Sequence, residues 1–226
     1  MNTLESQLNK LAISDKVAVV LQPSQIAEIS AKLLQHLKTM MDKWCTAHND
    51  DKFSGGKMRR SRGEEIERFV RYAVTIVGET CEMNVRAIKG GKDKKILSID
   101  RNDCALTKAH QVDVHVYKAD RFVMAIECKA YLDSCYYVRA CDDFRLFDKF
   151  GYDLKKFVFA MEDSIDAKTK AFTDIVTDNT CDDIFYMLEG KRMSSKPIYD
   201  EKHRKPVNEA MLERFVRALH TSLDTA

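Results

Sequence analysis

Three charged residues lie inside two apolar, strand-like stretches of the sequence. Asp113 stands between valines in QVDVHVYK (111–118), and Glu127 and Lys129 stand two positions apart in RFVMAIECKAYL (121–132). An ionised side chain near an apolar interior is costly unless an opposite charge or a metal ion binds it. The positions of these three residues therefore predict either a chemical site or an ion pair.

Strand geometry predicts how these side chains are arranged. Side chains two apart on a strand point to the same face of a sheet, so Glu127 and Lys129 should share a face while Cys128 points the opposite way. If the two stretches pair as a hairpin, Asp113 approaches Glu127 near the strand ends. Two adjacent carboxylates repel each other unless a cation lies between them. Mg²⁺ fits this place, because it prefers hard oxygen ligands and keeps several waters.

In this interpretation the metal ligands are Asp113, Glu127 and the backbone carbonyl of Cys128. The Lys129 ammonium would lie beside the attacking water and stabilise hydroxide and the negative charge of a phosphorane-like transition state. The ordinary alternative is a Glu–Lys pair on a solvated strand face, with Asp113 in a separate ion pair. Glu-x-Lys is a weak motif by itself. An aspartate on the preceding strand, fourteen residues before the glutamate and between apolar residues, favours a site.

His115 shares the predicted face of Asp113. It could be a metal ligand or a general base, although a lone histidine on a strand is more often a structural hydrogen-bonding group. Cys128 could be imagined as a nucleophile. Its predicted direction away from Glu127 and Lys129 favours a buried structural thiol instead.

The pattern resembles the PD-(D/E)xK nuclease superfamily and, within it, the type II restriction endonucleases. The motif residues that match are Val112-Asp113 and Glu127-Cys128-Lys129, with Val112 in place of the usual proline. The family's first core helix begins with a glycine, two variable residues, an apolar residue and a glutamate. These positions match Gly63, Ile66 and Glu67. The resemblance covers about residues 61 to 162.

The resemblance implies Mg²⁺-dependent hydrolysis of double-stranded DNA that leaves a 5′-phosphate and a 3′-hydroxyl. It implies that Glu67 reaches the metal site, often through water, and Glu64 and Glu65 are close alternatives. It also implies a homodimer, because two symmetric sites are needed to cut both strands of a palindrome. The alternatives are a structure-specific nuclease, such as a junction resolvase or repair nuclease, and a non-catalytic DNA-binding protein on the same scaffold.

Candidate DNA contacts lie in two segments. In the resembling enzymes the segment after the catalytic lysine often contributes recognition, and arginine can bind guanine through two hydrogen bonds. Here the candidates are Arg139 first, then Tyr136, Tyr137 and Arg145. The second segment is a basic arm at 52–63, predicted as a loop that contacts phosphates, with Lys57, Arg59, Arg60 and Arg62. The alternative for both segments is a set of solvated surface charges.

Hydrophobic periodicity predicts the elements that carry these residues. The fold expected is α/β, a restriction-endonuclease-like core with a mixed central sheet flanked by helices, plus an N-terminal helical segment. Helices are predicted at 23–48, 61–79, 137–151, 167–176 and 208–223. Strands are predicted at 111–118, 121–132, 155–162 and 182–188, with a hairpin over 84–100 around Gly90-Gly91.

The boundaries expected are an N-terminal segment at 1–60 and a catalytic core at 61–226, together forming one compact domain. Ser61 and Glu64 are predicted to form a capping box at the start of the second helix. The helices 23–48 and 208–223 are candidate dimer contacts.

Composition limits the class of protein. Of 226 residues, 45% are hydrophobic and 32% are charged, so the chain can bury a core, while a net charge of +2 gives no global nucleic-acid signature. No apolar run approaches the about 18 residues of a membrane span. Seven cysteines without regular spacing predict reduced thiols and a cytoplasmic location.

Overall fold

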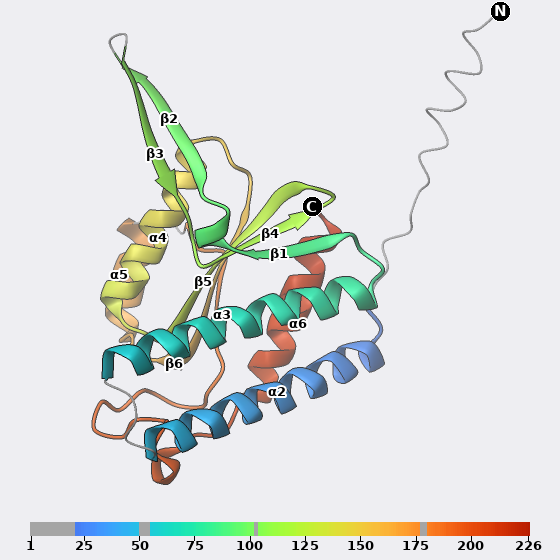
Figure 1. Cartoon of the computed structure of the whole chain (residues 1–226), viewed down its shortest axis with the longest axis vertical. Coiled ribbons are helices and arrows are strands. Elements are labelled where there is room, and N and C mark those ends of the chain that lie inside the picture. Colours follow the sequence, from blue (N-terminus) through green and yellow to red (C-terminus); the bar gives the residue numbers. More distant parts are fainter. Residues whose placement is uncertain (1–20, 50–54, 102–103, 177–179) are drawn as a thin grey trace, which may run out of the picture.

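A mixed five-stranded sheet lies between two layers of helices in the computed structural model, which describes residues 21–49, 55–101, 104–176 and 180–226 (Figure 1). Its strands are β1 Val85–Lys89, β4 Val114–Lys118, β5 Arg121–Leu132, β6 Lys155–Asp163 and β7 Asp183–Tyr186, in the spatial order β1-β4-β5-β6-β7. Pairing is antiparallel from β1 to β5 and parallel from β5 to β7. The predicted α/β class with a mixed central sheet is confirmed. The restriction-endonuclease-like nature of this core stays a prediction.

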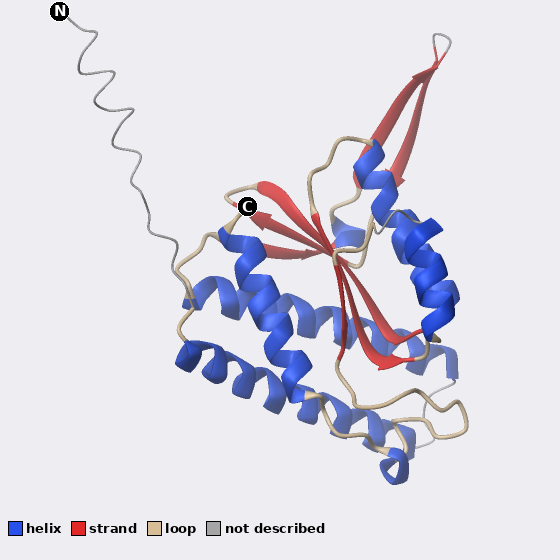
Figure 2. Cartoon of the chain, turned by 180° about the vertical axis from the view of Figure 1, so that it is seen from behind, coloured by secondary structure: helices blue, strands red, loops and turns tan. Residues whose placement is uncertain are grey.

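Helices cover both faces of the sheet (Figures 1 and 2). The first layer consists of α2 Pro23–Asn49, α3 Gly55–Thr80 and α6 Glu209–Asp224, and the second consists of α4 Ser134–Lys149 and α5 Ala167–Val176. Each layer encloses its own hydrophobic core against the sheet. The sheet residues that carry the candidate chemistry therefore lie between two packed layers.

The predicted apolar stripes of the first and last helices are buried inside this chain. Leu33 and Leu37 of α2, and Phe215 and Leu219 of α6, are fully buried in one shared core. Burial of large aliphatic and aromatic side chains contributes about 1.5–3 kcal/mol each, which explains why these two helices dock. Because these stripes pack within the chain, a dimer contact through α2 or α6 would use the other faces of these helices, and that contact stays a prediction.

The predicted hairpin over 84–100 is wrong. β1 pairs with β4, whereas β2 Lys95–Arg101 pairs with β3 Cys104–His110 in a separate two-stranded ribbon. Between β1 and β2 the chain forms a 3-10 turn at Gly90–Lys92. The ribbon projects from the sheet as an insertion between β1 and β4 (Figure 1). The sequence around Gly90-Gly91 resembles a hairpin turn, whereas the pairing of β1 with a strand 25 residues later leaves no local pattern.

The predicted start of the second helix is also wrong. α3 begins at Gly55, so the part of the basic segment from residue 55 onward is helical and not a loop. Ser61 lies inside the helix, and Glu64 binds Arg60 one turn earlier, so no capping box forms there. Residues 50–54 lie outside the described part. The helix continues through residues 60 and 61, where the boundary between the N-terminal segment and the core was predicted.

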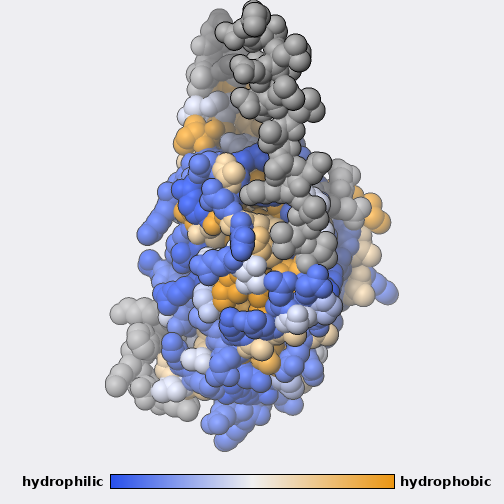
Figure 3. Space-filling view, turned by 90° about the vertical axis from the view of Figure 1, so that its right-hand side faces the viewer, coloured by the Kyte–Doolittle hydropathy of each residue, from blue (hydrophilic) through white to orange (hydrophobic). Residues whose placement is uncertain are grey.

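On the side shown in Figure 3 the surface is largely hydrophilic, with groups of hydrophobic residues between the hydrophilic ones. Within the described residues no helix combines the length and apolar character needed to cross a bilayer.

Candidate active site

Asp113 lies where β4 begins, beside the middle of β5. Val114 pairs with Ile126 in the antiparallel register of the two strands, which places the preceding residue, Asp113, next to Glu127. The Asp113 carboxylate (Oδ2) accepts a hydrogen bond of 2.8 Å from the backbone N–H of Cys128. The turn at Ala119 and Asp120, both with positive φ, closes the predicted hairpin. The hairpin thus carries Asp113 to β5.

The Lys129 ammonium bridges the two carboxylates. Its Nζ lies 3.2 Å from Asp113 Oδ2 and donates a second hydrogen bond to Glu127 Oε2. Cys128 belongs to the core on the α2–α3–α6 face, so Glu127 and Lys129 point to the opposite face, as their spacing predicts. We call Asp113, Glu127 and Lys129 the Asp113 cluster. The side chains meet as predicted, and their catalytic role stays a prediction.

Burial and mutual repulsion perturb the ionisation of this cluster. Glu127 is only 5% exposed, and burial followed by the Asp113 charge raises its pKa to about 8. Burial would lower the pKa of Lys129, but the Glu127 and Asp113 carboxylates outweigh burial and raise it. Lys129 is therefore held as an ammonium, which excludes it as a general base at neutral pH.

Glu67, on α3, interacts electrostatically with Asp113 of the Asp113 cluster. Its pKa is raised, first by burial and then by the charge of Asp113, and its Oε2 lies 3.2 Å from the Lys89 ammonium. Of the two alternatives, Glu65 accepts a hydrogen bond from the Trp44 indole, whereas Glu64 accepts one from Arg60 and also lies 3.8 Å from the Lys89 ammonium. Lys89 lies on β1 and was not among the predicted site residues.

The backbone that carries Asp113 is clamped from two sides. The Gly90 N–H donates to the Asp113 carbonyl at 2.9 Å, and a Cβ at Gly90 would lie 1.7 Å from the Val112 carbonyl oxygen. The Val112 N–H donates to His115 Nε2 at 3.3 Å. Only glycine permits this close approach. Gly90 and His115 thus position Asp113, and neither role could be derived from local sequence.

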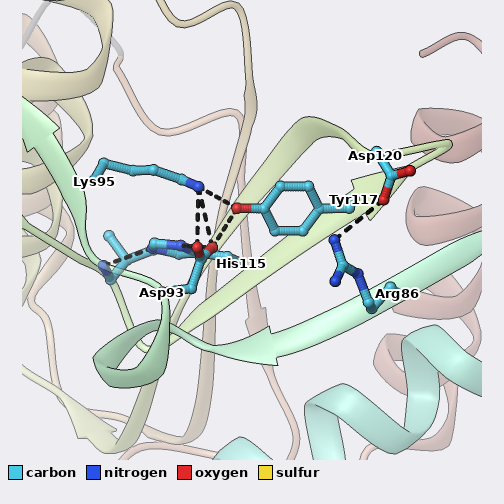
Figure 4. A network of polar contacts seen from close by, with 7 residues as sticks. Arg86, Asp93, Lys95, His115, Tyr117 and Asp120 are labelled. Atoms are coloured by element: carbon cyan, nitrogen blue, oxygen red, sulfur yellow. Dashed lines mark hydrogen bonds and ion pairs between the residues drawn. The ribbon is translucent and has the colours of Figure 1, made fainter.

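A second polar network holds His115 in place (Figure 4). His115 Nδ1 lies 3.0 Å from Asp93 Oδ2, and Asp93 also accepts from the Tyr117 hydroxyl and, at 3.2 Å, from the Lys95 ammonium. We call Asp93, Lys95, His115 and Tyr117 the Asp93 cluster. Burial lowers the pKa of His115 despite the Asp93 charge, so the ring is a neutral structural hydrogen-bonding group. Both ring nitrogens are engaged, Nδ1 with Asp93 and Nε2 with the Val112 N–H, so neither is available as a metal ligand or a base.

The donor set fits a hard divalent cation. In the described ranges no three His, Cys, Asp or Glu side chains converge as a ligand group, so the third ligand would be the Cys128 carbonyl. The N–H and C=O of an extended residue point to the same side, and the Cys128 N–H points at Asp113. Above about pH 8, where Glu127 is ionised as well as Asp113 and Glu67, three carboxylates stand against the ammonium groups of Lys129 and Lys89, and one negative charge is left over. Mg²⁺ takes this set of oxygen ligands.

The predicted DNA-contacting residues separate into different places. Tyr136 and Arg62 line a cavity that includes Lys129. Tyr137 is buried, and its hydroxyl donates to Asp174 Oδ1 at 2.6 Å, so this residue is a core member and not a surface contact. Arg139 is exposed on α4.

The other basic candidates lie farther from the cluster or outside the described side chains. Arg145 donates to the Val176 carbonyl at 2.8 Å, which ties α4 to the end of α5. The Arg60 side chain is 82% exposed beside Glu64. Lys57 and Arg59 lie in α3 by backbone, and their side chains are outside the described part.

Comparison with protein-family models gives no match, and comparison with curated protein sequences gives no significant match.

Proposed function

We propose that this chain is a Mg²⁺-dependent DNA endonuclease. One observation carries the proposal: a Lys129 ammonium lies between the Asp113 and Glu127 carboxylates where two adjacent strands meet, beside a cavity that contains Lys129. Two carboxylates held together in a partly buried place bind a divalent ion, and a fixed ammonium beside them favours negative charge on a reacting phosphate.

Asp113, Glu127 and the Cys128 carbonyl would hold the Mg²⁺ ion, which when bound supplies charge stabilisation at the phosphoryl oxygens and assists water ionisation. Asp113, which is partly exposed, accepts a hydrogen bond from the Cys128 N–H. This bond holds its carboxylate beside the Cys128 carbonyl that would be the third ligand. Lys129 stays protonated and stabilises the charge that develops on the attacking water and on the phosphate. Water attacks the phosphorus in line with the bond to the 3′-oxygen, and this bond breaks. The products are a 5′-phosphate and a 3′-hydroxyl, and no covalent enzyme intermediate forms.

The type II restriction class and the homodimer form the finer part of the proposal. Sequence-specific cutting of a palindrome needs two symmetric sites, and the exposed Arg139 on α4 is a candidate base contact. The dimer contact must use a surface other than the buried stripes of α2 and α6.

A structure-specific nuclease is the second candidate. The observation that favours it is the cavity beside Lys129, which is lined by tyrosine and arginine side chains. Unstacked bases bind aromatic rings and guanidinium planes, and such bases occur in branched or damaged DNA.

Digestion of a plasmid of known sequence, with Mg²⁺ or with EDTA, tests the proposal. We expect Mg²⁺-dependent cleavage, with discrete fragments if the enzyme is sequence-specific. Lys129→Ala and Asp113→Ala should each reduce the rate by about 10³-fold or more, because the first removes the ammonium beside the reacting phosphate and the second removes a ligand of the proposed metal ion. Arg214→Ala, at the β7 edge, is the matched control and should cut normally.

The remaining outcomes separate the alternatives. Cutting of branched DNA alone, without fragments from linear DNA, would favour the structure-specific nuclease. DNA binding without any metal-dependent cleavage would favour the non-catalytic protein. Undiminished cutting by Lys129→Ala would reject the proposed site.

A further inference from the structure

A cavity of about 490 Å³ opens beside Lys129. It is bounded by α2 and α3 through Trp44 and Arg62, by β5 and the start of α4 through Tyr131 and Tyr136, and by the loop that carries Arg192. Its size lies in the range of small-molecule binding sites, about 300–1,000 Å³. The Asp113 cluster therefore adjoins a space large enough for part of a substrate.

Flat aromatic and cationic groups line this cavity. The Arg192 guanidinium carbon lies 3.9 Å from the centroid of the Tyr131 ring, and the Arg62 carbon lies 4.3 Å from that of Tyr199. The Tyr136 ring contacts Tyr131 edge to face at 5.5 Å. Rings and guanidinium planes in this arrangement suit a flat, electron-rich ligand.

A buried carboxylate holds Arg192 in position. Glu162 is 4% exposed, and its two oxygens lie 2.8 Å from Lys205 Nζ and 3.8 Å from Arg192 Nε. The Arg192 N–H also donates to the Asp163 carbonyl at 2.6 Å, which anchors the loop to the end of β6. Lys205 and Arg192 together outweigh the single negative charge of Glu162, so the Arg192 end of the cavity favours an anion.

We infer that this cavity binds one unstacked nucleotide of a DNA strand that passes Lys129. A nucleotide combines the flat base and the negative phosphate that the cavity walls select, and Lys129 lies on the same wall where the strand would continue to the Asp113 cluster. The inference rests on the proposed function for its substrate, and it adds a preference for DNA with an unpaired or displaced base. A free mononucleotide has the same chemistry, so the test must distinguish the two sources.

Fluorescence titration in EDTA tests the inference without cleavage. The probes are two DNA duplexes of equal length, one fully paired and one with a single unpaired 2-aminopurine. We expect quenching of the unpaired base on binding, and an affinity about tenfold or more above that for the paired duplex, because stacking of one base contributes on this scale. Deoxyadenosine monophosphate should compete only weakly.

Single substitutions locate the effect. Arg192→Ala and Tyr136→Ala should each remove most of the preference, while Tyr136→Phe keeps the ring and should retain it. Arg214→Ala is the matched control, because its guanidinium carbon lies 5.4 Å from the Phe185 ring and it lines a different pocket. Thermal unfolding of each variant confirms that it is folded.

The outcomes of cleavage and binding are independent. Equal affinity for both duplexes, or preference unchanged in Arg192→Ala and Tyr136→Ala, would overturn the inference even if the protein cuts DNA. Competition by the mononucleotide at the affinity of the unpaired duplex would assign the cavity to a free nucleotide instead and overturn it too. Preference for the unpaired duplex without Mg²⁺-dependent cleavage would support the cavity and reject the nuclease.

Discussion

The Asp113 cluster and the Asp93 cluster both combine carboxylates with a lysine around strand β4, but they satisfy those carboxylates differently. In the Asp93 cluster one carboxylate accepts hydrogen bonds from three side chains, those of Lys95, His115 and Tyr117. In the Asp113 cluster two carboxylates share one ammonium, and a third carboxylate, Glu67, raises the negative charge nearby.

The pKa values express this difference. Burial would raise the pKa of Asp93, but the hydrogen bonds from Tyr117, His115 and Lys95 outweigh it, so the pKa is lowered. The pKa of Glu127 is raised to about 8, because it is buried and faces Asp113. The first cluster is complete by itself and stabilises the backbone next to Asp113. The second keeps a carboxylate with a raised pKa, and the Mg²⁺ ion that we propose would relieve this repulsion.

The largest expected effect is on the cleavage rate, and it distinguishes Lys129 from Lys95. Lys129→Met should lower the single-turnover rate of DNA cleavage in Mg²⁺ by about 10³-fold or more, because it removes a fixed charge beside the reacting phosphate. Lys95→Met should lower the rate by less than about tenfold, because Asp93 keeps its other donors. Equal losses in the two variants would remove the distinction between the clusters.

The response of stability to Mg²⁺ tests which of the two clusters binds the metal. Thermal unfolding at pH 8.5 should show stabilisation by Mg²⁺ of about 2.7 kcal/mol when the ion is at 100 times its dissociation constant. Asp113→Asn and Glu127→Gln should each abolish the response, since both carboxylates are proposed ligands. Asp93→Asn should preserve it. Stabilisation that survives in Glu127→Gln would place the ion elsewhere.

In the absence of metal, the Asp93 cluster should contribute more to the free energy of unfolding than the Asp113 cluster. Asp93→Ala should lower the free energy of unfolding by about 2 kcal/mol, because three partly buried donors lose a charged acceptor. Asp113→Asn should change it by less than about 0.5 kcal/mol, since the loss of a charge-assisted hydrogen bond is offset by relief of repulsion with Glu127. Urea unfolding in EDTA measures both. A larger loss for Asp113→Asn would contradict the repulsion between Asp113 and Glu127 argued for this cluster.

The last comparison is the pH dependence of stability in EDTA. The folded state holds a proton on Glu127 up to about pH 8, whereas the unfolded state loses it near the ordinary value of 4.5, so this group lowers stability as pH rises between these values. The slope from one group is at most about 1.4 kcal/mol per pH unit.

Glu127→Gln should therefore gain stability relative to the unchanged protein between pH 5.5 and 8.5. The Asp93 pKa is lowered, so its contribution is present above about pH 4 and is lost only in acid. A Glu127→Gln difference that does not vary with pH would show that Glu127 titrates normally.

The meeting of Asp113, Glu127 and Lys129 could be predicted because it depends on local rules. Alternation along β5 and one short turn place the three side chains together, and both act over fewer than 20 residues of chain. The apolar stripes of α2 and α6 were predictable for the same reason, since the period of a helix appears in its own sequence.

Other parts depended on contacts between distant segments. The pairing of β1 with β4, the close approach of Gly90 to Val112, and the choice of Glu67 over its neighbours follow from packing across the sheet. The burial of Tyr137 was likewise decided by α5. Local propensity does not predict these features, because the contacts that stabilise them join residues far apart in the chain.

The sequence by itself thus determined which residues form the Asp113 cluster, because strand alternation and a two-residue turn act locally. The tertiary structure alone decided how that cluster is clamped by Gly90 and His115, and that Arg192 and Tyr136 share a cavity with Lys129. The physical reason is that a cavity and a clamp are made by surfaces from several elements, and their position is fixed only when those elements pack together.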